Sequence, residues 1–169
     1  MFTVEDGTGL LGANAYIETS FADTYFSERE KLEWAALTST KKQAAIILAT
    51  DYIEVRFGRF FLGEKLVPES ALSFPRTGIS DYYDGLPLVL KKACAEYAYR
   101  VKDAPLAPDP EFDDTGYILK GRSVRVGPII DNVFYSTTGS SQQRIVRPYP
   151  EADLYLAPLL AVNSARSYR

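Results

Sequence analysis

The sequence of 169 residues contains no histidine, and this absence removes several kinds of chemistry. Histidine is the usual general base near neutral pH and the commonest metal ligand in proteins. Without it, neither a Ser-His nor a Cys-His nucleophilic pair can form. A Walker-type phosphate loop, a zinc ligand set and a nucleophile elbow are also missing from the sequence. We therefore expect a protein that is not an enzyme and that uses no cofactor or metal.

Cysteine is almost as scarce, since the sequence contains one, Cys94. An intrachain disulfide is therefore impossible, which favours a reducing compartment. Cys94 lies on the apolar stripe of an expected helix, so we predict a small core residue rather than a nucleophile. No apolar run approaches the ~18–20 residues of a membrane span, and no membrane partner is expected.

The charge is small overall but uneven along the chain. The net charge is −3, so the chain as a whole is not expected to bind polyanions. Residues 1–33 and 103–116 are rich in acids, and 103–116 contain no base. Residues 117–149 reverse this balance, with five basic residues against Asp131 alone. This basic segment is where an anionic partner would bind.

Three segments have the apolar spacing that predicts a helix. The first begins at residue 19 or 20. The second runs over 39–57 and is opened by Thr40-x-x-Gln43, which resembles a capping box. The third runs over 87–101 and carries a one-sided apolar stripe.

The remaining elements are shorter. Trp34 falls in a connection between the first two helices. Residues 117–135 alternate like two strands around the turn signal Gly127-Pro128, which predicts a β-hairpin. Residues 150–162 have a helical pattern that Pro158 should break or kink.

These elements predict a mainly α fold, a small bundle of three to four helices with a projecting β-hairpin and an extended C-terminal tail. The length suits a single domain over 1–169. Its expected parts are an irregular segment 1–15, a helical core 16–102, an acidic linker 103–116, the hairpin with its loop 117–149, and a short helix and tail 150–169.

The second helix contains six consecutive apolar residues, from Ala44 to Ala49. A run of this length covers every side of a helix, so burial nearly all round is expected. A central core helix is the favoured explanation. The alternative is that part of this surface packs against a neighbouring subunit, with Ile46, Ile47 and Leu48 as the candidate residues.

Two patterns with possible chemistry are set aside. Gly7 to Gly12 match G-x-G-x-x-G, but a dinucleotide site needs a strand before the loop, and the adjacent Glu5-Asp6 would repel a phosphate. The acid pairs at 81–84 and 113–114 supply too few ligands for a hard cation and lie in polar loops. We interpret both pairs as solvated loop acids.

The basic hairpin is a stronger candidate for binding. Arg122 and Arg125, with Arg144 and Arg147 beyond the loop, could follow a phosphate backbone. Aromatic residues at 117, 134 and 135 could stack on bases. The same arginines could instead pair with an acidic partner surface or with the 103–116 segment, and we favour this because the flanking acids weaken attraction to nucleic acid.

The turn Phe74-Pro75-Arg76 lies between the second and third helices. Pro75 restricts Phe74 to an extended conformation, so the pair can anchor the loop while Arg76 reaches outward. We expect a structural or subunit-interface loop, in which Arg76 bridges to a carboxylate or to carbonyl groups at a helix end.

Short strings along most of the chain resemble a phage family. They include Val4-Glu5-Asp6-Gly7-Thr8-Gly9, Ala13-Asn14-Ala15-Tyr16, Ala49-Thr50-Asp51-Tyr52-Ile53 and Leu72-x-Phe74-Pro75-Arg76-Thr77-Gly78. The family is labelled DnaT-like single-stranded DNA-binding protein, and the strings are also similar to small helical head-completion, or adaptor, proteins of tailed phages. The chain departs from this pattern by carrying Phe74 where tryptophan is expected.

The resemblance implies a structural virion protein of the phage neck, an adaptor ring between portal and tail through which DNA passes. Its partners would be further copies of the chain, commonly in a dodecamer, with the portal protein, a downstream neck or tail protein, and transient contact with genomic DNA. It would reside in the virion neck, and in the host cytoplasm during assembly. The hairpin and tail would be its binding arms, which adds Arg166 and Arg169 to the candidate partner-binding residues.

The alternative is a single-stranded DNA-binding replication protein. That function predicts a continuous basic and aromatic groove and an affinity that falls steeply with salt. The adaptor predicts weak DNA binding together with self-association or portal binding. A small hydrolase, the third option, has almost no support in the residues.

Overall fold

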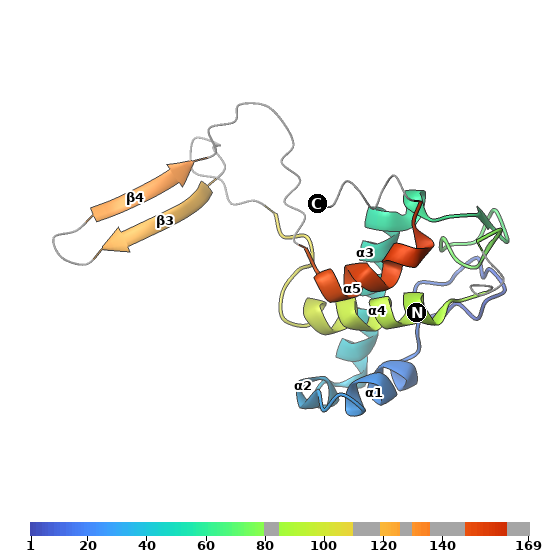
Figure 1. The fold of residues 1–169 in the computed structure, drawn as a ribbon. Helices are drawn as coiled ribbons and strands as arrows, with labels where there is room; N and C mark the ends of the chain where they lie inside the picture. The colour runs from blue at the N-terminus through green and yellow to red at the C-terminus, as the bar shows by residue number, and fades with distance from the viewer. Residues whose placement is uncertain (80–84, 110–118, 126–129, 136–147, 162–169) are drawn as a thin grey trace. The chain divides into compact units, whose positions relative to one another are not determined.

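The computed structural model describes residues 1–79, 85–109, 119–125, 130–135 and 148–161 (Figure 1). The chain divides into two compact units. The first, called the body below, comprises residues 1–106 and 148–169, and the second, the hairpin unit, comprises residues 107–147. The body is therefore built from two stretches of chain, and the hairpin unit is inserted between them.

Helices are the main regular structure of the described body. They are α1 (Thr19–Ser27), α2 (Leu32–Ala35), α3 (Ser39–Phe57), α4 (Leu88–Val101) and α5 (Pro150–Leu156), with the 3-10 turns η1 (Gly58–Phe60) and η3 (Ala157–Leu159). Helix α4 packs against both α3 and α5 (Figure 1). Together with the hairpin, this confirms the predicted mainly α fold. Within the described ranges, none of these helices combines the length and apolar character needed to cross a membrane.

Helix α4, rather than α3, is the helix most completely surrounded by the core. Its buried residues are Leu90, Ala93, Cys94, Ala95, Glu96, Tyr97 and Ala98. Many of these side chains are small, which lets the backbones of neighbouring helices come close. In α3, Ile46 is fully buried, but Ala44 is exposed and Leu48 is 52% exposed. The prediction that the run 44–49 is buried all round is therefore wrong, because composition alone does not show which side of a helix has neighbours.

The helix ends follow the sequence closely, with one difference at the start of α3. Its N-cap is Thr38, whose side-chain oxygen accepts a hydrogen bond from the Lys41 amide at 3.4 Å, and not Thr40. Both hydroxyls satisfy the chemistry of a cap, and the backbone conformation decides between them. At the other end of the chain, α5 ends at Leu156 and Pro158 lies in η3, as the predicted break requires.

The corner between α1 and α2 contains an element that the sequence did not predict. Trp34, expected in a connection, lies in α2 and is 1% exposed. Its indole Nε1 donates to Asp23 at 2.8 Å, and its ring packs on Phe26 with a centroid distance of 4.9 Å. Burial of this side chain therefore fixes a one-turn helix that is too short to show periodicity.

The hairpin consists of β3 (Leu119–Arg125) and β4 (Ile130–Tyr135), which pair antiparallel as predicted. Several other predicted features lie outside the described residues. They are the turn at Gly127-Pro128, the loop 137–143, the acid pairs at 81–84 and 113–114, and the tail from 163 onward.

The loop between α3 and α4 contains a minimal sheet, in which β1 (Glu64–Lys65) pairs with β2 (Arg76–Thr77). The Arg76 guanidinium donates Nε to the Leu62 carbonyl at 2.6 Å, Nη2 to the Phe61 carbonyl at 3.2 Å and to the Gly63 carbonyl, and Nη1 to the Ser73 carbonyl at 3.3 Å. Desolvation by burial lowers the pKa of Arg76. Arg76 thus joins the two sides of the loop through backbone carbonyls.

Phe74 anchors the same loop to the core. Its side chain is fully buried, and its ring makes edge contacts with Tyr16 and Phe61 at centroid distances of 6.5 and 4.9 Å. The Phe74-Pro75 peptide bond is cis. Beside it, the Ser73 hydroxyl donates to Glu54 Oε2 on α3 at 2.6 Å. The turn is therefore held by apolar packing and by polar contacts.

The turn that follows helix α1 contains a residue with an unusual backbone conformation. Glu30 has φ = 54°, in the left-handed region that favours glycine. The Lys31 amide donates to the Phe26 carbonyl at 3.0 Å and the Glu30 amide to the Ser27 carbonyl at 3.2 Å. This is the Schellman pattern, in which glycine is the preferred residue at the position of Glu30.

Replacing Glu30 with glycine should stabilise the protein. Glycine has no Cβ, so it avoids the steric cost that a side chain causes in a left-handed backbone conformation. We expect Glu30→Gly to raise the free energy of unfolding by about 1 kcal/mol in urea titrations. The matched control is Glu28→Gly, at a residue with right-handed helical φ and ψ, which should lower stability by about 0.5–1 kcal/mol. Equal effects of the two variants would contradict this account of the α1 end.

Removing the Arg76 side chain should destabilise the loop, because four carbonyls lose a charged donor. We expect Arg76→Ala to lower the free energy of unfolding by about 2–3 kcal/mol, measured by urea denaturation. Arg76→Lys keeps the charge but not the planar fork, so its loss should be intermediate. The exposed Arg59 is the control, and Arg59→Ala should change stability by less than about 0.5 kcal/mol. A stability for Arg76→Ala equal to that of the control would refute the bracing role.

Candidate nucleic-acid interface

The strand register places the two hairpin arginines at positions on opposite faces of the ribbon. Arg122 pairs with Val133, and Arg125 pairs with Ile130. Because successive residues of a strand alternate between its faces, positions three apart cannot share one. The hairpin therefore does not bring Arg122 and Arg125 into a single basic track.

Each face instead combines one arginine position with one aromatic position. Position 134 pairs with 121, four pairs along from the Arg125–Ile130 pair, and this even number of steps puts Phe134 on the face of Arg125. Position 135 shares the face of Arg122, as does the acidic Asp131, which pairs with Val124. The face of Arg125 and Phe134 carries no acid in either strand, so it suits an anionic ligand better.

The other predicted partner-binding residues are not placed. Arg144, Arg147, Arg166 and Arg169 all lie outside the described residues, and so does Tyr117. The continuous basic and aromatic groove expected of a single-stranded DNA binder stays a prediction for that part of the chain.

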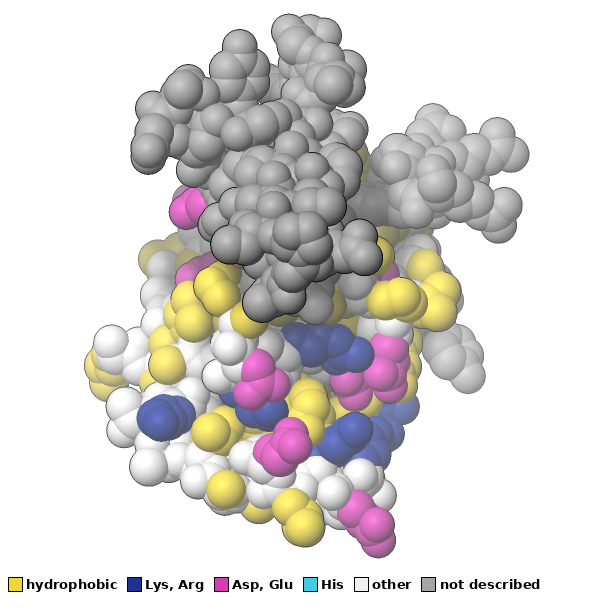
Figure 2. All heavy atoms as spheres, turned by 90° about the vertical axis from the view of Figure 1, so that its left-hand side faces the viewer, with side chains coloured by type: hydrophobic (Ala, Val, Ile, Leu, Met, Phe, Trp, Pro, Cys, Tyr) yellow, Lys and Arg dark blue, Asp and Glu magenta, His cyan; other side chains and the backbone are white. Residues whose placement is uncertain are grey.

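Several basic residues of the body pair with carboxylates. The Lys42 ammonium lies 2.8 Å from Asp23, and the Lys102 ammonium lies 3.2 Å from Glu33 and 2.6 Å from Asp103. On the face drawn in Figure 2, Lys and Arg side chains are interspersed with Asp and Glu side chains. Positive charge that is neutralised within the body is not available to follow a phosphate backbone.

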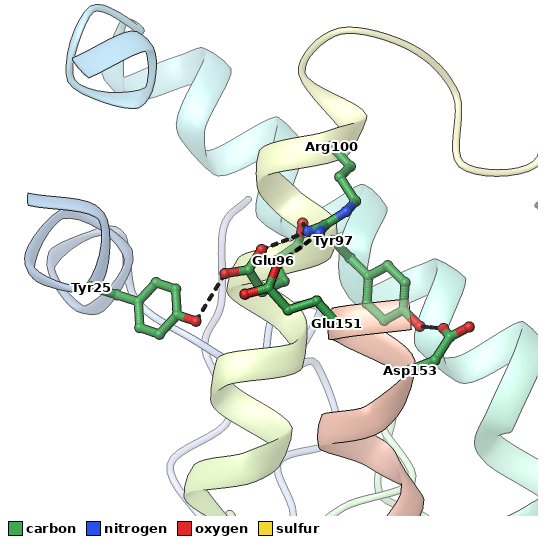
Figure 3. Close-up of polar contacts among 6 residues, drawn as sticks. All are labelled: Tyr25, Glu96, Tyr97, Arg100, Glu151 and Asp153. Carbon is green, nitrogen blue, oxygen red and sulfur yellow. Dashed lines mark hydrogen bonds and ion pairs between the residues drawn. The ribbon is translucent and has the colours of Figure 1, made fainter. Parts of the chain in front are cut away.

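A larger group of charged residues surrounds the buried carboxylate of Glu96 on α4 (Figure 3). Tyr25 on α1 donates its hydroxyl to Glu96 Oε1 at 2.9 Å, and Arg100 donates Nη1 to Glu96 Oε2 at 2.6 Å. Arg100 Nη2 also donates to Glu151 on α5 at 3.2 Å. Burial acts to lower the pKa of Arg100, but the bonds to the two glutamates outweigh it, so the pKa is raised. The group joins α1, α4 and α5.

Asp153 on α5 forms the second half of this arrangement. Its Oδ1 accepts the hydroxyl of Tyr97 on α4, and its Oδ2 lies 3.2 Å from the Arg56 guanidinium on α3. The Tyr149 amide donates to the same Oδ2 at 3.3 Å. Burial, and then the bond to Asp153, raise the pKa of Tyr97, so this phenol stays protonated and acts as a donor. One carboxylate thus connects three helices.

Sequence reasoning missed both groups. The Glu96 and Arg100 pair has the i, i+4 spacing of a helical ion pair, which was a usable signal. Arg56 and Asp153 are 97 residues apart, and no local pattern links them. These residues hold the body together.

The G-x-G-x-x-G loop is occupied by the chain's own acid. Glu5 is 2% exposed, and its Oε1 accepts the amides of Gly7 and Gly9 at 3.0 and 2.8 Å. Its Oε2 accepts the Leu10 amide at 2.9 Å. The amides that would receive a phosphate therefore already bind a carboxylate, which is a physical reason for setting the dinucleotide interpretation aside.

Cys94 is a core residue, as predicted. Cys94 is fully buried, with its sulfur 3.6 Å from the Thr50 hydroxyl, and burial raises its pKa to about 12. A thiol of this kind is a poor nucleophile.

The three candidate subunit-packing residues of α3 differ in exposure. Ile46 lies in the core, Ile47 is half-buried and Leu48 is exposed, so Leu48 is the one of the three best placed to meet a neighbour.

The comparisons with known proteins give one result. No curated protein and no solved structure matches the chain. The whole chain, residues 1–169, matches the model of a family described as "Putative DnaT-like ssDNA binding protein". The description names DNA binding and says nothing of phage heads or tails, so the match does not support the adaptor expectation. On this match over its full length, the chain belongs to the DnaT-like family.

Proposed function

We propose that this protein binds single-stranded DNA through its hairpin unit rather than through its helical body. Family membership supports the ligand. The strand register supports the place, because it puts Arg125 and Phe134 on the acid-free face of the hairpin. The presence of a cation and an aromatic residue on one face without acids is the observation that carries the proposal.

The chemistry of such a face is simple. An arginine neutralises a backbone phosphate and releases a counterion, while an aromatic ring stacks on a base of any identity. Binding of this kind is independent of sequence and sensitive to salt. The net charge of −3 gives no further attraction, so we expect moderate affinity.

Changes on the two faces of the hairpin should have unequal effects. We expect Phe134→Ala to weaken binding of fluorescent oligo-dT by about 5-fold or more, because one stacked base is lost. Arg125→Ala should weaken binding and reduce the slope of log affinity against log salt by about 0.7, the value for one phosphate contact on a single strand. Arg122→Ala should have the smaller effect, since Asp131 shares its face.

Fluorescence anisotropy at several salt concentrations measures these effects. Arg59→Ala, at an exposed arginine of the body, is the control and should leave affinity within about twofold of the unchanged protein. Binding that is unaffected by Phe134→Ala and Arg125→Ala, or that is lost in Arg59→Ala, would rule out the hairpin face. Absence of salt-sensitive oligo-dT binding at any concentration would rule out the function.

We propose as a second candidate an adaptor that joins the portal to the tail of a phage particle. The observation that favours it is the division of the chain into a closed helical body and a separate inserted unit, which suits a ring subunit with an arm. In this function the hairpin arginines pair with an acidic surface of the partner. The slightly acidic chain then forms a wall that does not hold passing DNA.

The adaptor predicts binding to a portal protein encoded beside this chain. We expect negative-stain electron microscopy to show ring-shaped density of this chain on purified portal particles. Arg122→Glu with Arg125→Glu should abolish this density, because both faces of the hairpin then repel an acidic surface, whereas Arg59→Glu should not. A protein that ignores portal particles but binds oligo-dT with steep salt dependence would exclude the adaptor.

A further inference from the structure

Helix α3 has an exposed stripe that its own core does not use. Its members are all exposed and are spaced three and four residues apart, and they are Lys41, Ala44, Leu48, Asp51 and Val55. Leu48 is 52% exposed and Val55 is 87% exposed. The buried residues of α3, such as Ile46, Ile53 and Phe57, lie on other positions of the helix. This α3 stripe has the 3-4 spacing of the packing surface of a coiled coil.

The two charges in the stripe differ from several others in the body, which are already paired. Lys42, Arg56, Arg100 and Lys102 each form an ion pair with a carboxylate. Among the described residues, neither Lys41 nor Asp51 forms an ion pair. Ten residues of helix separate them by roughly 15 Å, so they cannot pair with each other within one chain.

We propose that the α3 stripe binds the α3 stripe of a second copy of this chain, with the two helices antiparallel about a twofold axis at position 46. Lys41 then lies opposite Asp51 of the second copy, and Asp51 opposite its Lys41. Ala44 lies opposite Leu48 of the second copy, and Leu48 lies opposite Ala44 of the second copy. A small side chain therefore packs against a large one in both layers. If Lys41 is heptad position a, Leu48 is also at a, and Ala44 and Asp51 are at d. Each a position then faces a d position of the second copy, as is normal in antiparallel coiled coils.

The charges favour this arrangement over a parallel pair and over an antiparallel pair shifted along the helix. A parallel pair would put Lys41 on Lys41 and Asp51 on Asp51, and like charges at these positions repel. An antiparallel pair centred between positions 49 and 50 would put Leu48 against Asp51. Only the axis at position 46 pairs opposite charges and apolar side chains at the same time.

The size of the stripe sets the strength of the dimer. The paired positions 41 to 51 span about 15 Å of helix, because position 55 falls opposite position 37, which precedes α3. The interface is therefore smaller than the ~1,200–2,000 Å² of a stable complex. We therefore infer a weak, reversible dimer rather than a permanent one. A twofold contact is isologous and closes at two copies, so this inference is separate from any ring and does not depend on DNA binding.

Charge exchange between the two positions tests the pairing. Sedimentation velocity over about 5–500 µM should show reversible dimerisation of the unchanged protein. Lys41→Asp and Asp51→Lys alone should each weaken it about tenfold or more, because each creates two repulsive pairs. The double variant Lys41→Asp/Asp51→Lys restores both attractions, and its dissociation constant should return to within about threefold of the original value.

Leu48→Glu should abolish the dimer, and the matched control Leu154→Glu, at a leucine of α5 that is 71% exposed, should leave it unchanged. All the substituted positions are exposed, and circular dichroism checks that each variant folds. Three results would each overturn the proposal: a protein that stays monomeric throughout, a dimer indifferent to Leu48→Glu, or a double variant no better than the single ones.

Discussion

The whole body depends on the contacts that α5 makes with α3 and α4. The chain leaves the body after Leu106 and returns at Pro148, so α5 must bind helices that precede the insertion. Asp153 provides this connection, since one carboxylate receives Tyr97 from α4, lies 3.2 Å from Arg56 of α3 and accepts the Tyr149 amide. At the same point, the Tyr149 hydroxyl donates to the Leu106 carbonyl at 3.0 Å, which fixes the two ends of the insertion next to each other.

Many of the chain's distinctive polar residues are used in this way for structure. Glu5 closes the N-terminal glycine loop, Arg76 joins backbone carbonyls across the α3–α4 loop, and Glu96 collects donors from two helices. Residues engaged like this are unsuited to bind a ligand, because a ligand would have to replace buried hydrogen bonds. We therefore propose two binding surfaces outside these groups. They are the acid-free face of the hairpin, for single-stranded DNA, and the exposed stripe of α3, for a second copy of the chain.

The sequence predicts most of the helices and the hairpin, because periodicity and Pro and Gly positions act locally. The second helix was expected at 39–57 and α3 spans Ser39–Phe57. Burial was predicted less well: α4 rather than α3 is surrounded, since burial depends on neighbours distant in sequence. The paired roles of Arg56 and Asp153 were invisible for the same reason. The separation of Arg122 and Arg125 onto two faces follows from strand alternation, and applying that rule to the predicted strand would have found it.

We expect the body to be a complete folding unit, closed by α5, with the hairpin unit as an insertion into it. The most direct measurement compares amide NMR spectra of the full chain and of a chain in which 107–147 is replaced by a short Gly-Ser linker. In the shortened chain, amide resonances of α1, α3, α4 and α5 should keep their dispersion and nearly their positions. A collapsed spectrum, typical of an unfolded chain, would contradict this expectation.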